Sequence, residues 1–385
     1  PVLSPVVEIL AKQRTGTISA ADATAQINTL RGIDLRNELN RYVYRQAVAQ
    51  QHYLNFSGGN QLLSYQFSAG YNNNLPNIQG SKGADQYTLS SNASFRPLKG
   101  LEVQAGINYS HGTDKSYPFS LPKSYPYSQL ADAKGKHQAI PTERRLAYVD
   151  TAGGGMLLDW YYRPLDEIGL ADNNLTNSSV RLNFAVSYKL TSWLNAEVRY
   201  QYVDQAANNR NFYSQQTFRT RNLINTYTNL NQNSQNLRYP VPLGGILQLQ
   251  NITLNSHNAR AQFNVNKIWN AKHAFTALVA GEISEAKSTQ NSSQFYGYND
   301  ATGVYQSDID YLNFYPIYGT PDMATVPQGD IYTDGPFNRI VSVLANASYT
   351  YNNRYTFYAS ARRDGSNVFG VNTNNRWKPL WSIGA

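Results

Sequence analysis

The sequence of 385 residues lacks cysteine altogether and lacks any long apolar run. Without cysteine, the chain can hold no disulfide framework, no cysteine-ligated zinc cluster and no thiol nucleophile. No stretch of about 18 consecutive apolar residues is present, so the sequence offers no membrane-spanning helix either. The absence of cysteine is compatible with an oxidising compartment of the cell envelope.

Motifs for catalysis and for cofactor binding are also missing. The five histidines are dispersed through the chain and form no H-E-x-x-H pair. There is no G-x-S-x-G elbow and no Walker-type loop, since the glycines at 153–155 are not followed by Lys-Ser or Lys-Thr. Asp308 and Asp310 lack the spacing of a calcium-binding EF loop and are better explained as solvated loop carboxylates. The sequence therefore predicts a protein that is not an enzyme, with no cofactor and no metal-binding residues.

Charged residues are scarce, at 15% of the chain, and the formal net charge is +8. Lysine and arginine are scattered and form no dense run, so the sequence does not favour nucleic-acid binding. The mean hydropathy of -0.52 would by itself suggest a water-soluble protein. A membrane β-barrel also has a low mean hydropathy, because only every second residue of a strand faces lipid.

The sequence is rich in segments where apolar and polar residues alternate strictly. Between Leu101 and Tyr109 every second residue is apolar, and Glu102, Gln104 and Asn108 stand between them. The same pattern recurs over residues 180–190 and 194–202. Because successive side chains of a strand point to opposite faces, each segment is predicted to be a strand between an apolar and a wet environment. A soluble β-sandwich alternates too, so alternation alone does not separate the two interpretations.

The connections between these strands are alternately very short and very long. Short turns are expected at residues 57–60, 96–100, 191–193, 269–272 and 352–354. Long connections are expected at residues 72–86, 110–179, 204–253, 284–337 and 365–376. Loops beyond about 15 residues are uncommon in soluble domains, whereas outer-membrane barrels combine short periplasmic turns with long extracellular loops. The rhythm therefore predicts a transmembrane β-barrel segment.

Tyrosine is abundant, with 30 residues, and many tyrosines fall at the predicted strand ends. Trp193 and Trp269 lie beside two of the short turns. Amphipathic rings at the level of the lipid headgroups form the girdles of outer-membrane barrels. Ordinary cross-strand packing explains some of these tyrosines. The aromatic content agrees with a lipid bilayer as a partner of the sheet.

Residues 1–50 differ from the rest and are expected to form a helical extracellular loop segment. Ser19 and Asp22 resemble a capping box, and apolar residues follow at helical spacing with an interruption near Gly32. Residues 51–385 are then expected to form a partial barrel of about ten or eleven strands. No export signal is visible at Pro1, so we expect the chain to be an internal piece of a longer protein.

Residue identity adds to periodicity near the end of the chain. The run that starts at Arg362 reads R-R-D-G-S-N-V-F-G. It resembles the R-x-D-G-S-x-x-F-G signature in the barrel of SusC/RagA-type TonB-dependent transporters. The signature positions are Arg362, Asp364, Gly365, Ser366, Phe369, Gly370 and Arg376. The segment from Leu30 to Tyr71 is similar to the same family's approach to an early barrel hairpin, whereas residues 378–381 depart from its pattern.

This resemblance implies an antiparallel barrel of 22 strands around an N-terminal plug domain. About half of that barrel is expected here, without the plug. The resemblance also implies energy-coupled import of a large nutrient, a glycan or an oligopeptide, across the cell outer membrane. The implied partners are a SusD-like surface lipoprotein and the TonB complex, which would be contacted through a missing N-terminal part.

One loop segment has the composition of a ligand-binding surface. Trp160, Tyr161 and Tyr162 stand between Asp159 and Arg163, and planar rings beside hydrogen-bonding groups suit stacking on a sugar or a peptide. The same rings would also anchor the loop through an aromatic cluster of their own. Two other functions stay open at this point, a passive outer-membrane porin and a secreted carbohydrate-binding β-protein.

Overall fold

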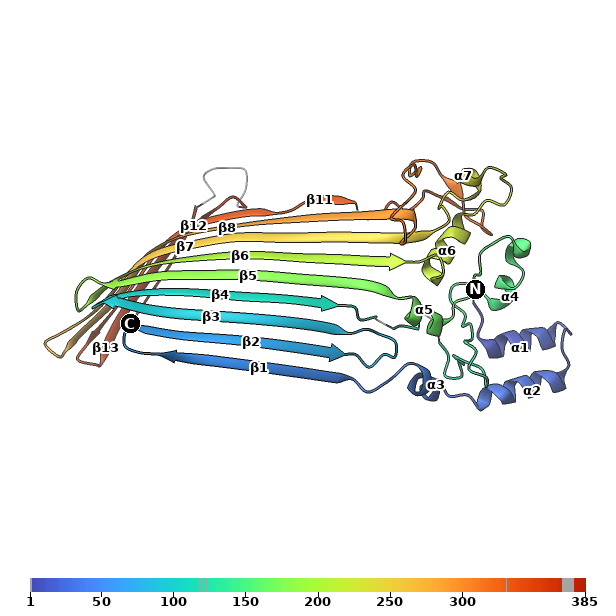
Figure 1. Cartoon of the computed structure of the whole chain (residues 1–385), viewed down its shortest axis with the longest axis horizontal. Coiled ribbons are helices and arrows are strands. Elements are labelled where there is room, and N and C mark those ends of the chain that lie inside the picture. Colours follow the sequence, from blue (N-terminus) through green and yellow to red (C-terminus); the bar gives the residue numbers. More distant parts are fainter. Residues whose placement is uncertain (1, 118, 122–123, 330, 369–376) are drawn as a thin grey trace.

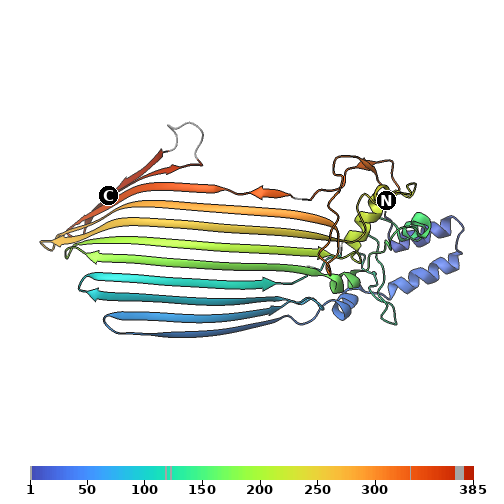
Figure 2. The same ribbon diagram turned by 45° about the horizontal axis from the view of Figure 1, so that its top comes forward.

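The computed structural model describes residues 2–117, 119–121, 124–329, 331–368 and 377–385, and most of them belong to one antiparallel sheet. The strands of this sheet are β1 (Val48–Gly59), β2 (Leu63–Leu75), β3 (Ala84–Leu98), β4 (Leu101–Asp114), β5 (Asp172–Lys189), β6 (Leu194–Tyr213), β7 (Gly245–Trp269), β8 (His273–Tyr298), β11 (Tyr332–Asp334), β12 (Phe337–Tyr351), β13 (Tyr355–Ser366) and β14 (Trp377–Gly384). They pair in the order β1-β2-β3-β4-β5-β6-β7-β8-β12-β13-β14, and β11 pairs with β8. The path ends at β1 and at β14, so the sheet is an open, curved wall (Figures 1 and 2). The predicted all-β barrel segment is confirmed.

Helices and long connections gather at one end of the wall, and short turns lie at the other (Figure 1). The helices are α1 (Pro5–Arg14), α2 (Ala20–Arg31), α3 (Leu35–Tyr42), α4 (Leu146–Val149), α5 (Pro164–Leu170), α6 (Phe218–Tyr227), α7 (Gln235–Arg238) and the 3-10 helix η1 (Ala152–Gly155). The small strands β9 (Tyr315–Pro316) and β10 (Met323–Ala324) form a separate pair. Short and long connections alternate as predicted from β1 to β13, and the predicted connection at residues 365–376 lies mostly outside the described residues.

Two of the short turns reverse the chain through left-handed residues. Asn270 and Ala271 have φ values of 51° and 53°, and Asn352 and Asn353 have values of 50° and 52°. Paired positive φ angles match the right-handed twist of the flanking strands, and asparagine adopts them at low cost. These turns hold β7 against β8 and β12 against β13 in register.

Several strands extend well beyond the range that alternation predicts. β6 continues past Asp204 to Tyr213, and β8 continues past Ser284 to Tyr298. The predicted loop boundaries were therefore wrong at these places. In the added parts Asn, Gln and Ser occupy both faces, because both are in water, and the backbone ladder holds the strands together without a hydrophobic pattern.

The N-terminal helices begin and end largely where the sequence indicates. The Ser19 hydroxyl accepts a hydrogen bond from the Asp22 backbone N–H at 3.0 Å, and α2 ends before Gly32. The helix α1 was not predicted from the sequence, although a capping serine, Ser4, followed by Pro5 at the first helical position is a recognisable start signal. Whether residues 1–50 form a separate unit stays a prediction. Among the described residues, no helix is long and apolar enough to cross a membrane.

The strand register places the apolar residues of neighbouring strands on one face. Ala105 pairs with Phe184, which pairs with Tyr200, and the same row continues through Ala259 and Ile283. Large apolar side chains on this face are exposed, because no described residue covers them. They include Leu54, Phe184, Val198, Phe263, Val279 and Val343. A broad exposed apolar face on a barrel wall is the face that contacts lipid.

Aromatic residues border this apolar band at both edges. At the short-turn edge the rings of Trp269 and His273 stack with centroids 5.2 Å apart, and the His273 ring shares a hydrogen bond of 2.6 Å with the Tyr349 hydroxyl. At the other edge His257 packs against Tyr202, with centroids 5.0 Å apart. From His257 to Trp269 along β7, a rise of about 3.4 Å per residue and a tilt of about 40° give a band of about 30 Å. This height matches the hydrocarbon core of a bilayer.

Candidate functional site

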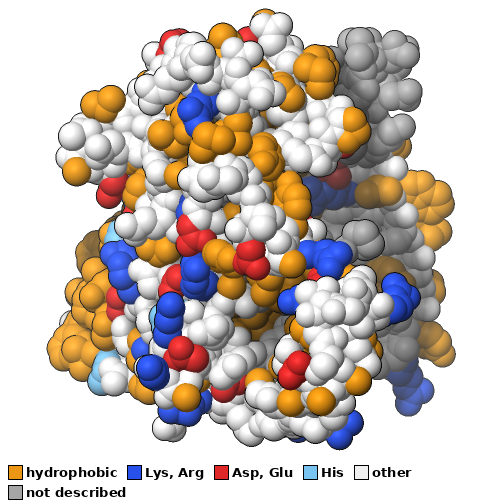
Figure 3. All heavy atoms as spheres, turned by 90° about the vertical axis from the view of Figure 1, so that its right-hand side faces the viewer, with side chains coloured by type: hydrophobic (Ala, Val, Ile, Leu, Met, Phe, Trp, Pro, Cys, Tyr) orange, Lys and Arg blue, Asp and Glu red, His pale blue; other side chains and the backbone are white. Residues whose placement is uncertain are grey.

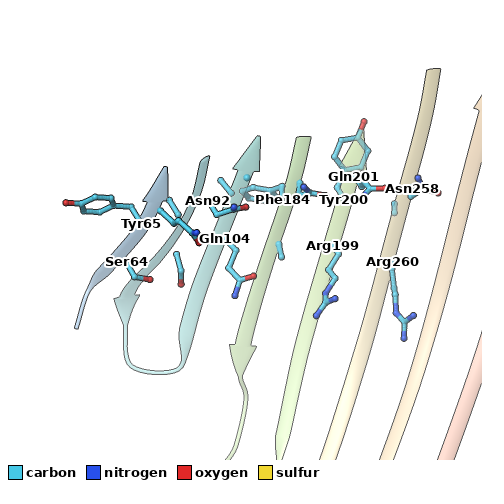
Figure 4. A pocket seen from close by; sticks show the side chains of 18 of the residues that line it. Ser64, Tyr65, Asn92, Gln104, Phe184, Arg199, Tyr200, Gln201, Asn258 and Arg260 are labelled. Carbon is cyan, nitrogen blue, oxygen red and sulfur yellow. Dashed lines mark hydrogen bonds between the residues drawn. The ribbon is translucent and has the colours of Figure 1, made fainter. Parts of the chain in front are cut away.

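The opposite face of the wall is polar and forms an open hollow of about 970 Å³ between β1 and β8. Figure 4 shows Gln104, Arg199 and Arg260 projecting from three strands to one side, whereas the Tyr200 ring projects to the other. The polar lining residues include Ser57, Ser64, Gln66, Asn92, Ser94, Gln104, Asn183, Arg199, Gln201, Asn258, Arg260, Glu282 and Ser284. Hydrogen-bonding groups on this face and lipid-facing groups on the other give the sheet the two environments of a barrel wall.

A network of ion pairs crosses this polar face beside the hollow. Glu282 on β8 binds the Arg260 guanidinium at 2.6 Å and the Arg362 guanidinium at 3.4 Å. Arg362 in turn pairs with Asp364 at 2.7 Å and donates to the Ser342 hydroxyl at 3.0 Å. The network therefore links β7, β8, β12 and β13 through one carboxylate that has two cationic partners.

The structure shows how four of the signature residues are placed. Arg362 and Asp364 lie in this polar network, and the Ser366 hydroxyl accepts a hydrogen bond from the Val368 backbone N–H at 3.2 Å. Gly365 lies on the lipid-facing side, where a side-chain Cβ would be 3.0 Å from the indole of Trp377. The other three signature positions, 369, 370 and 376, lie outside the described residues. The signature does not predict that Arg362 contacts Glu282 on β8 and Ser342 on β12, because both residues are distant in the sequence.

The long connections pack into a layer with its own buried core at the outer end of the sheet. One of its buried clusters contains Ile224 and Tyr227 of α6. On the same helix Asn225 is fully buried and donates to the Leu158 carbonyl at 2.8 Å, while its Oδ1 accepts from the Leu158 N–H at 2.9 Å. Arg221 on the same helix donates to the Asp159 carbonyl at 2.6 Å. Sequence reasoning missed both residues, since a polar helix inside an apparent loop has no local signal of burial. Figure 3 views this layer end-on, with charged and apolar side chains interspersed.

The predicted ligand-contacting aromatics lie mostly inside this layer. Trp160 is 5% exposed, and its Nε1 donates to Asn222 at 2.8 Å. The guanidinium of Arg144 covers the Trp160 ring at 4.1 Å from the centroid. Tyr162 is 8% exposed and packs against Phe218, whereas Tyr161 is half-buried and donates its hydroxyl hydrogen to Asp150. Trp160 and Tyr162 thus anchor the loop layer, and contact with a ligand stays a prediction.

Two carboxyl groups of the loop layer have environments that shift their pKa. Burial raises the pKa of Glu167, which accepts a hydrogen bond from the Phe218 backbone N–H at 2.8 Å. Hydrogen bonds from Asn313 and from the Leu312 backbone lower the pKa of Asp310 to about 2. The described residues contain no group of three or more His, Asp or Glu side chains placed to hold a metal ion.

Comparison with known proteins gives one curated relative and a set of similar folds. No protein-family model matches the chain. The TonB-dependent receptor P39 of Formosa agariphila is 30% identical over 110 residues, which are 29% of this chain and 9% of that receptor. A structure of the RagAB peptide transporter has a TM-score of 0.64, with 15% identity, and this chain covers 34% of its length. The RagAB importer in its closed-closed state matches with a TM-score of 0.63 at the same identity and coverage.

The fold and its two faces define a wall segment of an outer-membrane β-barrel. Over these 110 residues the chain is similar to a TonB-dependent receptor, and its fold is that of the barrel wall in the RagAB structures, which agrees with the sequence resemblance to SusC/RagA-type transporters. It spans about a third of the length of the solved structures that it matches. The predicted location in the cell outer membrane is confirmed with the fold.

Proposed function

We propose that this chain forms wall and outer loops of a transporter that imports a large nutrient across the outer membrane, with energy supplied through the TonB complex. The observation that carries the proposal is the polar hollow of about 970 Å³ directly behind a lipid-facing apolar wall. Its amide, hydroxyl and charged side chains can exchange hydrogen bonds with a hydrated solute that passes along the wall.

The proposed substrate is an oligopeptide or a glycan. Asparagine, glutamine and serine side chains donate and accept, so they suit peptide groups and sugar hydroxyls equally. The arginines and glutamate beside them add sites for the charged ends of a peptide. The RagAB structures are of a peptide transporter, which favours the peptide alternative. The proposed role is passage and not catalysis.

A deletion strain tests this proposal. The strain without the full-length transporter should fail to take up one class of labelled nutrient, oligopeptides or glycans, and the gene supplied in trans should restore uptake. Loss of uptake when TonB is removed separates this proposal from a passive porin, whose transport would continue. If the full-length protein partitions into water without detergent, both membrane functions are excluded and the secreted binding protein is favoured.

A SusD-like surface lipoprotein is the proposed partner at the outer end. The connection between β8 and β12 presents two apolar side chains to solvent, Leu312 at 88% exposed and Phe314 at 64%. Asp310 fixes this tip, because its carboxylate accepts from the backbone N–H groups of Leu312 and Asn313 at 2.9 and 3.0 Å. A rigid exposed apolar pair is a typical anchor for a protein partner.

Co-purification of the lipoprotein with the full-length transporter tests the partner. Replacing Leu312 and Phe314 together with serine should reduce the amount of lipoprotein recovered. The matched control is Leu98→Ser, because Leu98 is 65% exposed but lies at the short-turn end of the sheet. Equal recovery from both variants would contradict this docking site.

A further inference from the structure

Basic side chains concentrate on one sector of the lipid-facing side. Lys287 on β8, Arg339 on β12 and Arg363 on β13 are all exposed on this face. The register places Lys287 and Arg339 close together, since Lys287 pairs with Phe337 and Arg339 lies two residues further along β12. They lie near the outer end of the apolar band, because Arg339 pairs with Glu285, which pairs with His257 of the outer aromatic edge.

Arg363 is the most informative member of this group. It pairs with Val343 and Pro379, so it lies inside the apolar band itself. Its guanidinium lies over the ring of Trp377 at 5.6 Å from the centroid. Because Trp377 pairs with Gly365, two residues nearer the outer end, the Arg363 side chain is directed toward the outer interface. An arginine that faces lipid is costly at the bilayer midplane and tolerated near the interface, where its long side chain reaches the headgroups.

The charges in this sector do not balance. Arg339 donates from Nε to the Glu285 carboxylate at 2.8 Å, and its guanidinium also lies 5.3 Å from the centroid of the Phe337 ring. Asp204 on β6 is exposed on the same face and lies in the same row as Lys287, so Glu285 and Asp204 are two anions beside three cations. The described strands β1 to β7 have tyrosines and histidines on this face at the same height, among them Tyr71, Tyr87, Tyr109, Tyr202 and His257. With Asp204 counted, the surplus on this part of the face is one positive charge, and the three cations lie on β8, β12 and β13.

We propose that Lys287, Arg339 and Arg363 bind phosphate groups of anionic lipid headgroups in the outer leaflet. A guanidinium presents paired N–H donors that match two phosphate oxygens, and a lysine ammonium adds a point charge. The aromatic rings beside both arginines hold the guanidinium groups at headgroup depth. The site lies on the membrane side of the wall, so it depends on the outer-membrane placement and not on the transport proposal.

Retention of lipid by the full-length transporter tests this site. The protein is purified in mild detergent, and bound phosphate-bearing lipid is measured by native mass spectrometry. The triple variant Lys287→Gln, Arg339→Gln, Arg363→Gln should lose at least about nine tenths of the lipid that the wild type retains. The matched control is Lys267→Gln, because Lys267 is also on the lipid-facing side but lies over Trp193 at the short-turn edge. The control should retain lipid as the wild type does.

Three outcomes would overturn the proposal. The first is equal lipid retention by the triple variant and the wild type. The second is equal binding of a dephosphorylated lipid. The third is full displacement by inorganic phosphate alone, which would indicate a site for the free ion. Heat-modifiable migration checks that each variant folds, and the single change Lys287→Gln at an exposed position should show a smaller loss in the same direction if the triple variant does not fold.

Discussion

Replacing Asn225 with alanine should loosen the outer loop layer without affecting the barrel wall. The Asn225 amide satisfies both peptide groups of Leu158, at 2.8 and 2.9 Å, and the side chain is fully buried. These two hydrogen bonds join the β4–β5 connection to α6 in the β6–β7 connection. Alanine would leave the N–H and C=O groups of Leu158 without these partners, next to a cavity that its smaller side chain cannot fill.

The expected cost follows from those two orphaned groups. Each unsatisfied buried peptide group costs about 1 to 3 kcal/mol, and a water molecule that enters the vacated space recovers part of it. A net loss of about 2 to 3 kcal/mol corresponds to about 30- to 150-fold faster opening of this layer, at 1.4 kcal/mol for each factor of ten. Asn225→Asp should be at least as damaging, because its carboxylate would face the Leu158 carbonyl oxygen.

Hydrogen–deuterium exchange on the full-length transporter measures this opening directly. In peptides that cover residues 156–163 and 218–228, amide exchange should become about 30- to 150-fold faster. Exchange in peptides from β3 to β6 should stay the same. Asn233→Ala is the matched control, because Asn233 is exposed in the same connection as Asn225. Unchanged protection at Leu158 in the Asn225 variant would refute the reasoning, and equal loss in the control would show that the effect is not specific.

Four further predictions follow from the same contacts. Glu282→Gln should lower the stability of the folded barrel by about 1 to 2 kcal/mol, since two partly exposed arginine pairs are lost; an unchanged urea midpoint would contradict this. Because burial raises the pKa of Glu167, its contribution to stability is present below the ordinary value of 4.5 and is lost as pH rises through the raised value. In the Glu167→Gln variant, the protection of α6 amides against hydrogen exchange should therefore no longer depend on pH in this range, once the intrinsic pH dependence of amide exchange has been subtracted. Gly365→Ala should displace the Trp377 indole, lower the free energy of unfolding by about 1 to 2 kcal/mol and shift tryptophan emission to the red. An unchanged emission spectrum and an unchanged urea midpoint would contradict close packing of Gly365 against Trp377. The chain by itself has open edges at β1 and β14, so it should not migrate as a heat-modifiable, detergent-resistant barrel.

Several features of this protein follow from its sequence. Alternation from Leu101 to Tyr109 and in the segments like it determines the strands and their two faces. The uneven connections determine on which side of the membrane each end lies. Ser19 and Gly32 mark the limits of α2. These features depend on neighbours in the sequence and on a contrast between lipid and water, so a single strand or turn contains the necessary information.

Other features depend on contacts between residues far apart in the sequence. The polar extensions of β6 and β8 show no alternation, because water lies on both of their faces, and only pairing with the next strand defines them. Glu282 acquires its arginine partners only when β7, β8, β12 and β13 are aligned. The burial of Trp160 depends in the same way on α6 and on Arg144.

The sequence by itself thus determined the membrane wall and its orientation, because a strand that separates lipid from water must alternate residue by residue. The tertiary structure alone decided which polar side chains meet in the hollow, which aromatic rings are buried in the loop layer and where the lipid-facing arginines gather. Those arrangements depend on the register between strands and on the packing of distant loops, and neither is encoded in the pattern of any one segment.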